Sequence, residues 1–318
     1  YTVNTGSRTS GTYTDTQTVN DQYERFMEAS TIVSYNPSGY TLGGSTSWVS
    51  GSVSDLTSDN SVYMTFRSYV SASSTTAKTD AFIAYRDSTT SLNIPKERTW
   101  TGDTTSWGSQ SDIPTADSPV RCVRVAYSPI EQRSFEKIVV TLSDDGYLDA
   151  YVWDGTSWNV TNNIGQVWTS APADARRLYD IVYESQSGNA LLVYGTTVTG
   201  GTNDLAYRVW TFGTGWGPEQ YCDDADHASK VTVTYVVLAS DPNSDKIGMA
   251  YIESTNSHAN AVIWNGSSWN NFVEITGTVA ITTEECVAIA SESVSGAFMV
   301  VAGEDLSLIH ISEPTRPY

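Results

Sequence analysis

A short tryptophan phrase recurs along the chain and constrains its fold more than any other feature. It reads Trp153-Asp-Gly-Thr-Ser-Trp158 and Trp264-Asn-Gly-Ser-Ser-Trp269, with looser copies at 100–107 and 210–216. The second tryptophans of the four copies, at 107, 158, 216 and 269, are 51, 58 and 53 residues apart. A period of about 50 residues built from short strands is typical of β-propeller blades. The recurrence therefore predicts an all-β fold of repeated sheets.

Each unit contains four segments with strand character. In the clearest unit these are 124–128, 137–142, 147–153 and a strand that opens at Trp158. Tight turns at Asp144-Asp-Gly146 and Asp154-Gly155 separate the last three, since Asp-Gly pairs favour hairpins. The second strand of each unit is the most continuously apolar, so we expect it to be buried between neighbouring blades.

The period divides the chain into three parts. Four-stranded blades occupy 76–305, with about five visible and the last incomplete. Residues 1–75 hold a different β repeat, in which 11–26 matches 51–66, and predict a partial β-sandwich or jelly-roll-like segment. The strand at 62–69 could belong to either part, and the Ser/Thr-rich stretch 71–78 marks the boundary by composition. Residues 306–318 resemble a translated sequencing adapter, so we expect the natural sequence to stop near Asp305.

Charge and composition limit the possible partners. The 318-residue chain has a net charge of −19 and a pI near 4.3. That charge repels nucleic acids and anionic lipid, so nucleic acid is not expected as a partner. No run of 18 apolar residues occurs, so we expect no direct membrane insertion by this fragment. Only 17% of residues are charged, and a surface rich in Ser, Thr, Asn and Gly is typical of secreted prokaryotic proteins. An extracellular or cell-surface location follows as an expectation.

Two features of the chain leave alternatives open. Cys122, Cys222 and Cys286 are far apart, so one disulfide with a free thiol and three buried thiols are both possible. The repeated tryptophans favour a structural role, with each pair clasping across the third and fourth strands. The same residues are also the candidate ligand-binding residues, namely Trp153, Trp210, Trp264, Trp158, Trp216 and Trp269.

Catalytic and metal-binding signals are sparse. We find no catalytic motif and expect no catalytic residues, no cofactor and no enzyme activity. Asp223, Asp224 and Asp226 form the densest oxygen-ligand group, but the alternating spacing of a calcium loop is missing, so a structural calcium there is the alternative. Three carboxylates, Asp180, Glu184 and Glu253, sit near strand ends and could face one mouth of a propeller. The remaining conspicuous residues are the isolated His227 and His258 and the pair Arg176-Arg177, which predicts a surface turn.

Segments 51–69, 81–90 and 137–153 resemble large uncharacterised surface proteins of archaea and bacteria. This resemblance covers the chain nearly to residue 305 and implies export, but it supplies no catalytic residues. The Trp-x-Gly-x-x-Trp hairpin also resembles bacterial propeller lectins, in which aromatic faces between blades hold sugars. Our main expectation is a structural or adhesive scaffold whose partners are other surface proteins or glycans. The alternatives are a carbohydrate-binding propeller and a polysaccharide-degrading enzyme.

Overall fold

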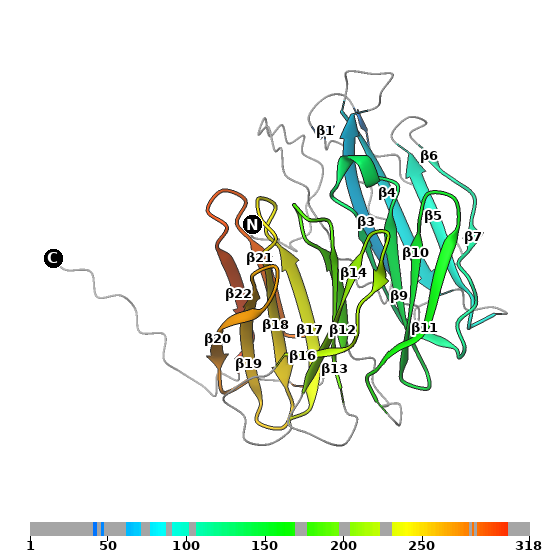
Figure 1. The fold of residues 1–318 in the computed structure, drawn as a ribbon. Helices are drawn as coiled ribbons and strands as arrows, with labels where there is room; N and C mark the ends of the chain where they lie inside the picture. Colours follow the sequence, from blue (N-terminus) through cyan, green and yellow to red (C-terminus); the bar gives the residue numbers. More distant parts are fainter. Residues whose placement is uncertain are drawn as a thin grey trace, which may run out of the picture.

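Antiparallel β-sheets make up nearly all of the described chain. The computed structural model describes residues 41–42, 46–47, 62–70, 77–86, 91–101, 106–168, 177–196, 204–222, 231–279, 282 and 285–304. Figure 1 shows these sheets standing side by side in chain order. Within this part the single helical element is the 3-10 turn η1 (Glu131–Arg133).

Within the described residues, four blades and a two-stranded sheet follow one another in sequence order. Blade I comprises β3 (Val62–Val70), β4 (Ala77–Arg86), β5 (Pro95–Thr101), β6 (Ser106–Trp107) and β7 (Ser111–Asp112). Blade II comprises β8 (Val120–Tyr127), β9 (Lys137–Ser143), β10 (Tyr147–Trp153) and β11 (Trp158–Gln166). Blade III comprises β12 (Tyr179–Tyr183), β13 (Ala190–Gly195), β14 (Leu205–Thr211), β15 (Gly215–Trp216) and β16 (Gln220–Cys222). Blade IV comprises β17 (Val233–Ser240), β18 (Ile247–Glu253), β19 (His258–Trp264) and β20 (Trp269–Thr276). Sheet V comprises β21 (Val287–Ser291) and β22 (Phe298–Ala302), and a separate pair is β1 (Thr41–Leu42) with β2 (Thr46–Ser47).

The first strands of successive blades are neighbours, which is the arrangement of a β-propeller. Contacts join β3 to β8, β8 to β12, β12 to β17 and β17 to β21. The N–H of Val236 donates to the carbonyl of Arg177 at 2.8 Å, and the Ser240 hydroxyl donates to the carbonyl of Tyr183 at 2.6 Å. Strands β12 and β17 therefore run in the same direction around a common axis. The all-β fold of four-stranded blades predicted from the tryptophan period is confirmed.

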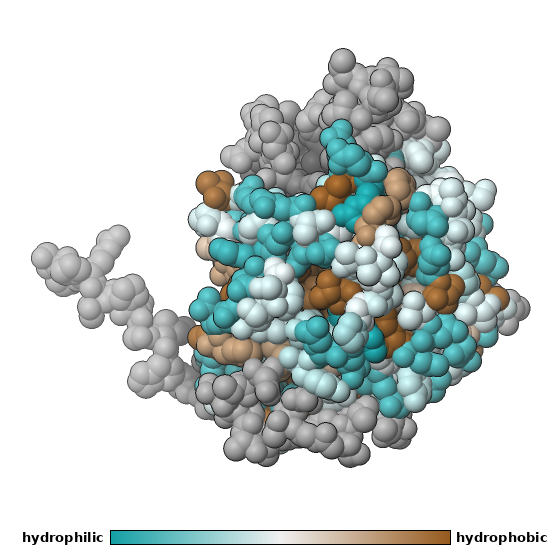
Figure 2. All heavy atoms as spheres, viewed as in Figure 1, coloured by the Kyte–Doolittle hydropathy of each residue, from teal (hydrophilic) through white to brown (hydrophobic). Residues whose placement is uncertain are grey.

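The hydrophobic core is divided among the interfaces between blades. One buried cluster lies between each consecutive pair of sheets, from blades I and II to blade IV and sheet V. The second strands β9, β13 and β18 are buried along their whole length, as their apolar sequences predict. Polar and apolar residues mix on the outside of the molecule, as Figure 2 shows for one face. Each blade therefore buries its apolar side chains chiefly against the neighbouring blades.

Loops at one end of the propeller connect neighbouring blades. We call this end the loop rim; it contains the connections between first and second strands, at 128–136, 184–189, 241–246 and 292–297. Arg133 Nη2 donates to the carbonyl of Ser187 at 3.1 Å, which links blades II and III. The N–H of Ser187 donates to Asp245 Oδ1 at 2.8 Å, which links blades III and IV. Asn243 Nδ2 in turn donates to the carbonyl of Ser293 in sheet V.

The tryptophan hairpins also lie at the loop rim and are built by the side chain that follows the first tryptophan. Asp154 Oδ1 accepts hydrogen bonds from the N–H groups of Thr156 and Ser157 at 2.8 and 2.9 Å. Gly155 takes a φ of 98°, a conformation that side-chain-bearing residues rarely adopt. Asn265 and Gly266 repeat this turn in blade IV, with a φ of 96° at the glycine. The Trp-Asx-Gly phrase is therefore explained by this one turn, which needs an Asp or Asn side-chain acceptor followed by a glycine with a positive φ.

The two tryptophans of each phrase clasp across the hairpin, as predicted. They are register partners in blades I to IV. The ring centroids lie 5.4 Å apart for Trp153 and Trp158, and the same distance for Trp264 and Trp269. The rings meet edge to face, a favourable geometry for aromatic pairs.

The blades are of two kinds, which differ in the fourth strand. In blades I and III this strand is broken into two short pieces, whereas β11 and β20 of blades II and IV are continuous. In both broken blades a tyrosine from the second strand reaches the residue that directly precedes the second piece. Tyr85 Oη donates to Gln110 Oε1 at 3.2 Å, and Tyr194 Oη donates to Glu219.

The structure places three further features of the sequence. β3 pairs with β4 along its length, so blade I begins at Val62 and includes residues assigned by composition to the 1–75 segment. Among the described residues, Cys122, Cys222 and Cys286 form no disulfide, and the first two are buried. The repeat at 11–26, the Asp223, Asp224 and Asp226 group, His227 and the segment 306–318 lie outside the described residues.

Candidate ligand pocket

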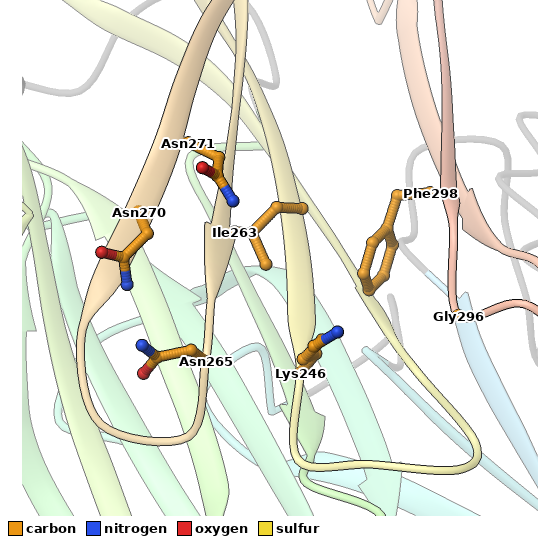
Figure 3. Close-up of a pocket in the computed structure, with 7 residues that line it drawn as sticks. All are labelled: Lys246, Ile263, Asn265, Asn270, Asn271, Gly296 and Phe298. Carbon is orange, nitrogen blue, oxygen red and sulfur yellow. The ribbon is translucent and has the colours of Figure 1, made fainter.

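A pocket opens at the loop rim between blade IV and sheet V. Its volume is about 470 Å³, within the range of small-molecule sites. Figure 3 shows its lining. The seven residues are Lys246, Ile263, Asn265, Asn270, Asn271, Gly296 and Phe298.

A β-bulge in blade IV forms the amide-bearing side of the pocket. Ile263 of β19 pairs with Asn270, but Ala261 pairs with Val273, so β20 has two residues opposite one. Asn271 lies in this bulge with a φ of 58°, a left-handed conformation that asparagine tolerates. The bulge sets Asn270 and Asn271 beside Ile263 at the pocket (Figure 3).

An aromatic ring forms the opposite side. Phe298 opens β22 and lies over Gly248 of β18, where an added Cβ would be 2.5 Å from its Cδ1. Gly296 begins this side with a φ of 67°, and its added Cβ would be 2.9 Å from Asp241 Oδ2. The two glycines therefore allow the phenyl ring and its turn to approach blade IV closely. The pocket therefore depends on packing between two separate sheets, blade IV and sheet V, which are consecutive along the chain.

The polar side chains offer the pocket more hydrogen-bond donors than acceptors. Asn265 Oδ1 already accepts the N–H of Ser268 at 2.9 Å, which leaves its NH2 group for a ligand. Asn270 Nδ2 donates to the carbonyl of Ser268 at 3.2 Å, which leaves its Oδ1. Among the described residues, no hydrogen bond or ion pair engages the Asn271 amide or the Lys246 ammonium group.

Two carboxylates beside the pocket, those of Asp241 and Asp245, accept hydrogen bonds from loop groups. Asp245 Oδ1 accepts the N–H groups of Gln186 and Ser187, both at 2.8 Å. Asp241 Oδ1 accepts the N–H of Asn243 at 3.0 Å, and its Oδ2 accepts the Ser244 hydroxyl at 2.5 Å. Neither is among the lining side chains, so Lys246 is the charged group among the described residues that line the pocket.

The six tryptophans singled out by the sequence do not line this pocket. Each pair packs toward the preceding blade, where Trp158, Trp216 and Trp269 contact the cores between blades. In blade IV, Tyr207 of blade III meets Trp264 and Trp269 edge to face, at centroid distances of 5.4 and 5.8 Å. Sequence reasoning missed the pocket's own residues, although Asn265 lies within one of the tryptophan phrases and Asn270 directly follows it.

The three carboxylates that could have formed a catalytic group lie apart. Glu184 follows β12 at the loop rim, whereas Glu253 ends β18 and pairs with Val233 at the opposite rim. Glu253 Oε1 accepts from Asn260 Nδ2 at 2.5 Å. Asp180 is buried in β12, where its Oδ2 accepts the N–H of Leu238 at 2.9 Å. The expectation that these residues face one mouth is wrong, because first and second strands end at opposite rims.

Arg177 is buried, so the prediction of a surface turn at this residue is wrong. Its Nη2 donates to Asp180 Oδ2 at 2.6 Å, and its Nη1 donates to Glu285 Oε1 at 2.8 Å. Glu285 precedes β21 of sheet V, whereas Arg177 precedes β12 of blade III. The guanidinium therefore joins two sheets that flank blade IV.

The described residues contain few other candidates for chemistry. His258 Nδ1 lies 3.1 Å from Glu274 Oε2 at the exposed edge of blade IV. Within the described ranges, no three His, Cys, Asp or Glu side chains are grouped as metal ligands would be. No helix in the same ranges has the length and apolarity to cross a membrane.

Solved structures with distantly similar folds include lectins and a glycosidase. A six-bladed fucose-recognising lectin of Aleuria aurantia is 16% identical, with a TM-score of 0.45, over 69% of this chain and 63% of the lectin. A mutant of AofleA from Arthrobotrys oligospora is 12% identical, with a TM-score of 0.44, over 78% and 84%. The α-L-arabinofuranosidase Arb93A of Fusarium graminearum is 11% identical, with a TM-score of 0.45, over 75% and 74%. The chain thus spans less than two thirds of the Aleuria lectin. Protein-family models and curated proteins give no match.

Proposed function

We propose that the chain is a carbohydrate-binding propeller protein that holds a saccharide in the pocket between blade IV and sheet V. The observation that carries this proposal is the meeting of three side-chain amides with a phenyl ring around one cavity. Amides both donate to and accept from hydroxyl groups, which a sugar carries around its ring. An aromatic side chain offers a flat apolar surface to the C–H face of the same sugar.

The pocket is better suited to binding a small ligand than to catalysing a reaction. It has amides, an ammonium group and apolar side chains, and none of the described residues that line it is a carboxylate, histidine, cysteine or serine. Glycoside hydrolysis needs two carboxylates flanking the bond that breaks. Binding without turnover is therefore the function that this lining supports. The pocket lining and the hydroxyl-rich composition of the chain together support extracellular glycans as the proposed partners.

A glycan array followed by calorimetry tests the proposal. We expect the chain to retain a saccharide, and Asn270→Ala to weaken that binding about tenfold because it removes an acceptor and opens the amide side. Asn159→Ala is the matched control. It changes the equivalent hairpin position of blade II, where Asn159 Nδ2 donates to Asp154 at 3.0 Å. Retention of no saccharide at millimolar concentration, or equal weakening by both variants, would overturn the proposal.

A further inference from the structure

We infer that the pocket selects an anionic saccharide, one bearing a carboxylate or sulfate group, over its neutral counterpart. This inference rests on the proposed function and names the ligand class of the same pocket. Its basis is the hydrogen-bonding balance of the lining and the position of one lysine.

The lining favours a ligand rich in acceptors. The NH2 groups of Asn265 and Asn271 and the ammonium group of Lys246 present donors, against acceptors only at Asn270 and Asn271. A neutral sugar hydroxyl can meet either kind of group, so it draws no advantage from this imbalance. A carboxylate or sulfate accepts through every oxygen, and its hydrogen bonds to charged donors are stronger than neutral ones.

Lys246 places a positive charge at the pocket, and no described side chain forms an ion pair with it. It directly precedes β18, and its side chain lines the pocket between the asparagine hairpin and Phe298 (Figure 3). Asp241 and Asp245 keep their negative charges, but they accept hydrogen bonds from loop N–H and hydroxyl groups and form no ion pair with Lys246. Glu292 is occupied likewise, because its Oε2 accepts the N–H of Ser295 at 2.8 Å.

The charge of the whole chain limits how long such a ligand can be. At a net charge of −19, the protein repels a polyanion along most of its surface. A single anionic residue in the pocket meets the local ammonium group at short range, where screening by salt is weakest. We therefore expect selection of an isolated or terminal anionic sugar rather than of a densely charged polysaccharide.

Calorimetry with matched sugars separates this inference from the proposed function. The probes are a neutral glycan retained on the array and its uronate-terminated and sulfated counterparts. We expect tighter binding of at least one anionic form, and Lys246→Gln to weaken that binding about tenfold while changing neutral binding less than about twofold. Lys246→Arg keeps the charge and should retain the preference. Because Lys246 is exposed, both variants should fold.

The outcomes point to different failures. If the neutral glycan binds as tightly as both anionic forms, or if Lys246→Gln weakens all three equally, the charge inference is overturned and carbohydrate binding stands. If no glycan binds, the proposed function itself fails. Sulfated and uronate arms that differ would identify which anion the pocket accepts.

Discussion

The indole Nε1 of Trp264 donates a 2.6 Å hydrogen bond to Oε1 of Glu184, which belongs to the preceding blade. Both side chains are buried. The other carboxylate oxygen of Glu184 accepts from Asn189 at 3.2 Å and from Ser187. The carboxylate thus ties the loop of blade III to the hairpin of blade IV. One of the recurring tryptophans and one of the three carboxylates near strand ends are parts of a single contact between blades.

Loss of this contact should destabilise the fold. Trp264→Phe removes the N–H while keeping an aromatic ring, so the buried Glu184 carboxylate loses a donor. We expect the free energy of unfolding in urea to fall by roughly 1–3 kcal/mol.

Trp269→Phe is the matched control for this change. Trp269 forms the other half of the same clasp, but within the described chain its buried Nε1 has no hydrogen-bond partner. Its replacement should therefore cost less than that of Trp264. Equal losses for the two variants would mean that ring volume, rather than the bond to Glu184, governs the effect.

Glycine should be required in the tryptophan hairpin for conformational reasons. Gly266 has a φ of 96°, yet the nearest atom to an added Cβ, Asp245 Cβ, is 3.4 Å away. Gly266→Ala should therefore lower the unfolding free energy by about 1–2 kcal/mol through backbone strain without a clash. Gly217→Ala, also in a blade edge but without a positive φ, should have a smaller effect. Thermal unfolding of the two variants checks the difference.

Asp154 should make stability depend on acid pH. Hydrogen bonds from Thr156, Ser157 and Asn159 lower the pKa of this carboxyl below its ordinary value. A lowered folded-state pKa contributes stability above the unfolded value of about 3.9, and this is lost as pH falls through the folded pKa. Asp154→Asn keeps the acceptor, as Asn265 does in blade IV, but cannot titrate. Denaturation from about pH 5 to about pH 2 should show a shallower loss for this variant, and an unchanged slope would contradict the assignment.

The buried cluster around Arg177 should tolerate the loss of its cation poorly. Its side chain is 3% exposed, and that of Asp180 is equally buried, whereas that of Glu285 is 27% exposed. Arg177→Met leaves the Asp180 carboxylate without its cation, so we expect a loss of about 3–5 kcal/mol in unfolding free energy. Glu285→Gln should cost far less, because water reaches that end of the cluster. Chemical denaturation of both variants checks this difference. If Glu285→Gln lost as much unfolding free energy as Arg177→Met, the ion pair of Arg177 with Glu285, rather than that with Asp180, would be the main contribution.

The blades were predictable because their requirements are local. A turn that needs Asp or Asn followed by glycine, between strands that end in paired indoles, leaves its whole pattern in six consecutive residues. The burial of β9, β13 and β18 follows in the same way from runs of apolar residues. Such features depend little on what lies farther along the chain.

The pocket and the ion pairs were not predictable, because they depend on contacts between blades. Nothing near Phe298 in the sequence indicates that its ring lies over Gly248, and the left-handed bulge at Asn271 leaves no pattern in a chain rich in asparagine. Arg177 follows another arginine in the sequence, which suggests a solvated pair. Its burial becomes evident only when β12 and β21 are placed on either side of β17.

The broken and continuous fourth strands alternate, so the unit that truly recurs is twice the length suggested by the tryptophans. Trp100 and Trp210, in the two broken blades, are 110 residues apart, and Trp153 and Trp264, in the two continuous ones, are 111 apart. Equivalent positions should accordingly be sought two blades away. A consensus sequence averaged over adjacent blades would mix the broken and the continuous kinds of fourth strand. Exchange of a pair of blades, such as I and II for III and IV, would keep each kind of fourth strand beside the same kind of neighbour.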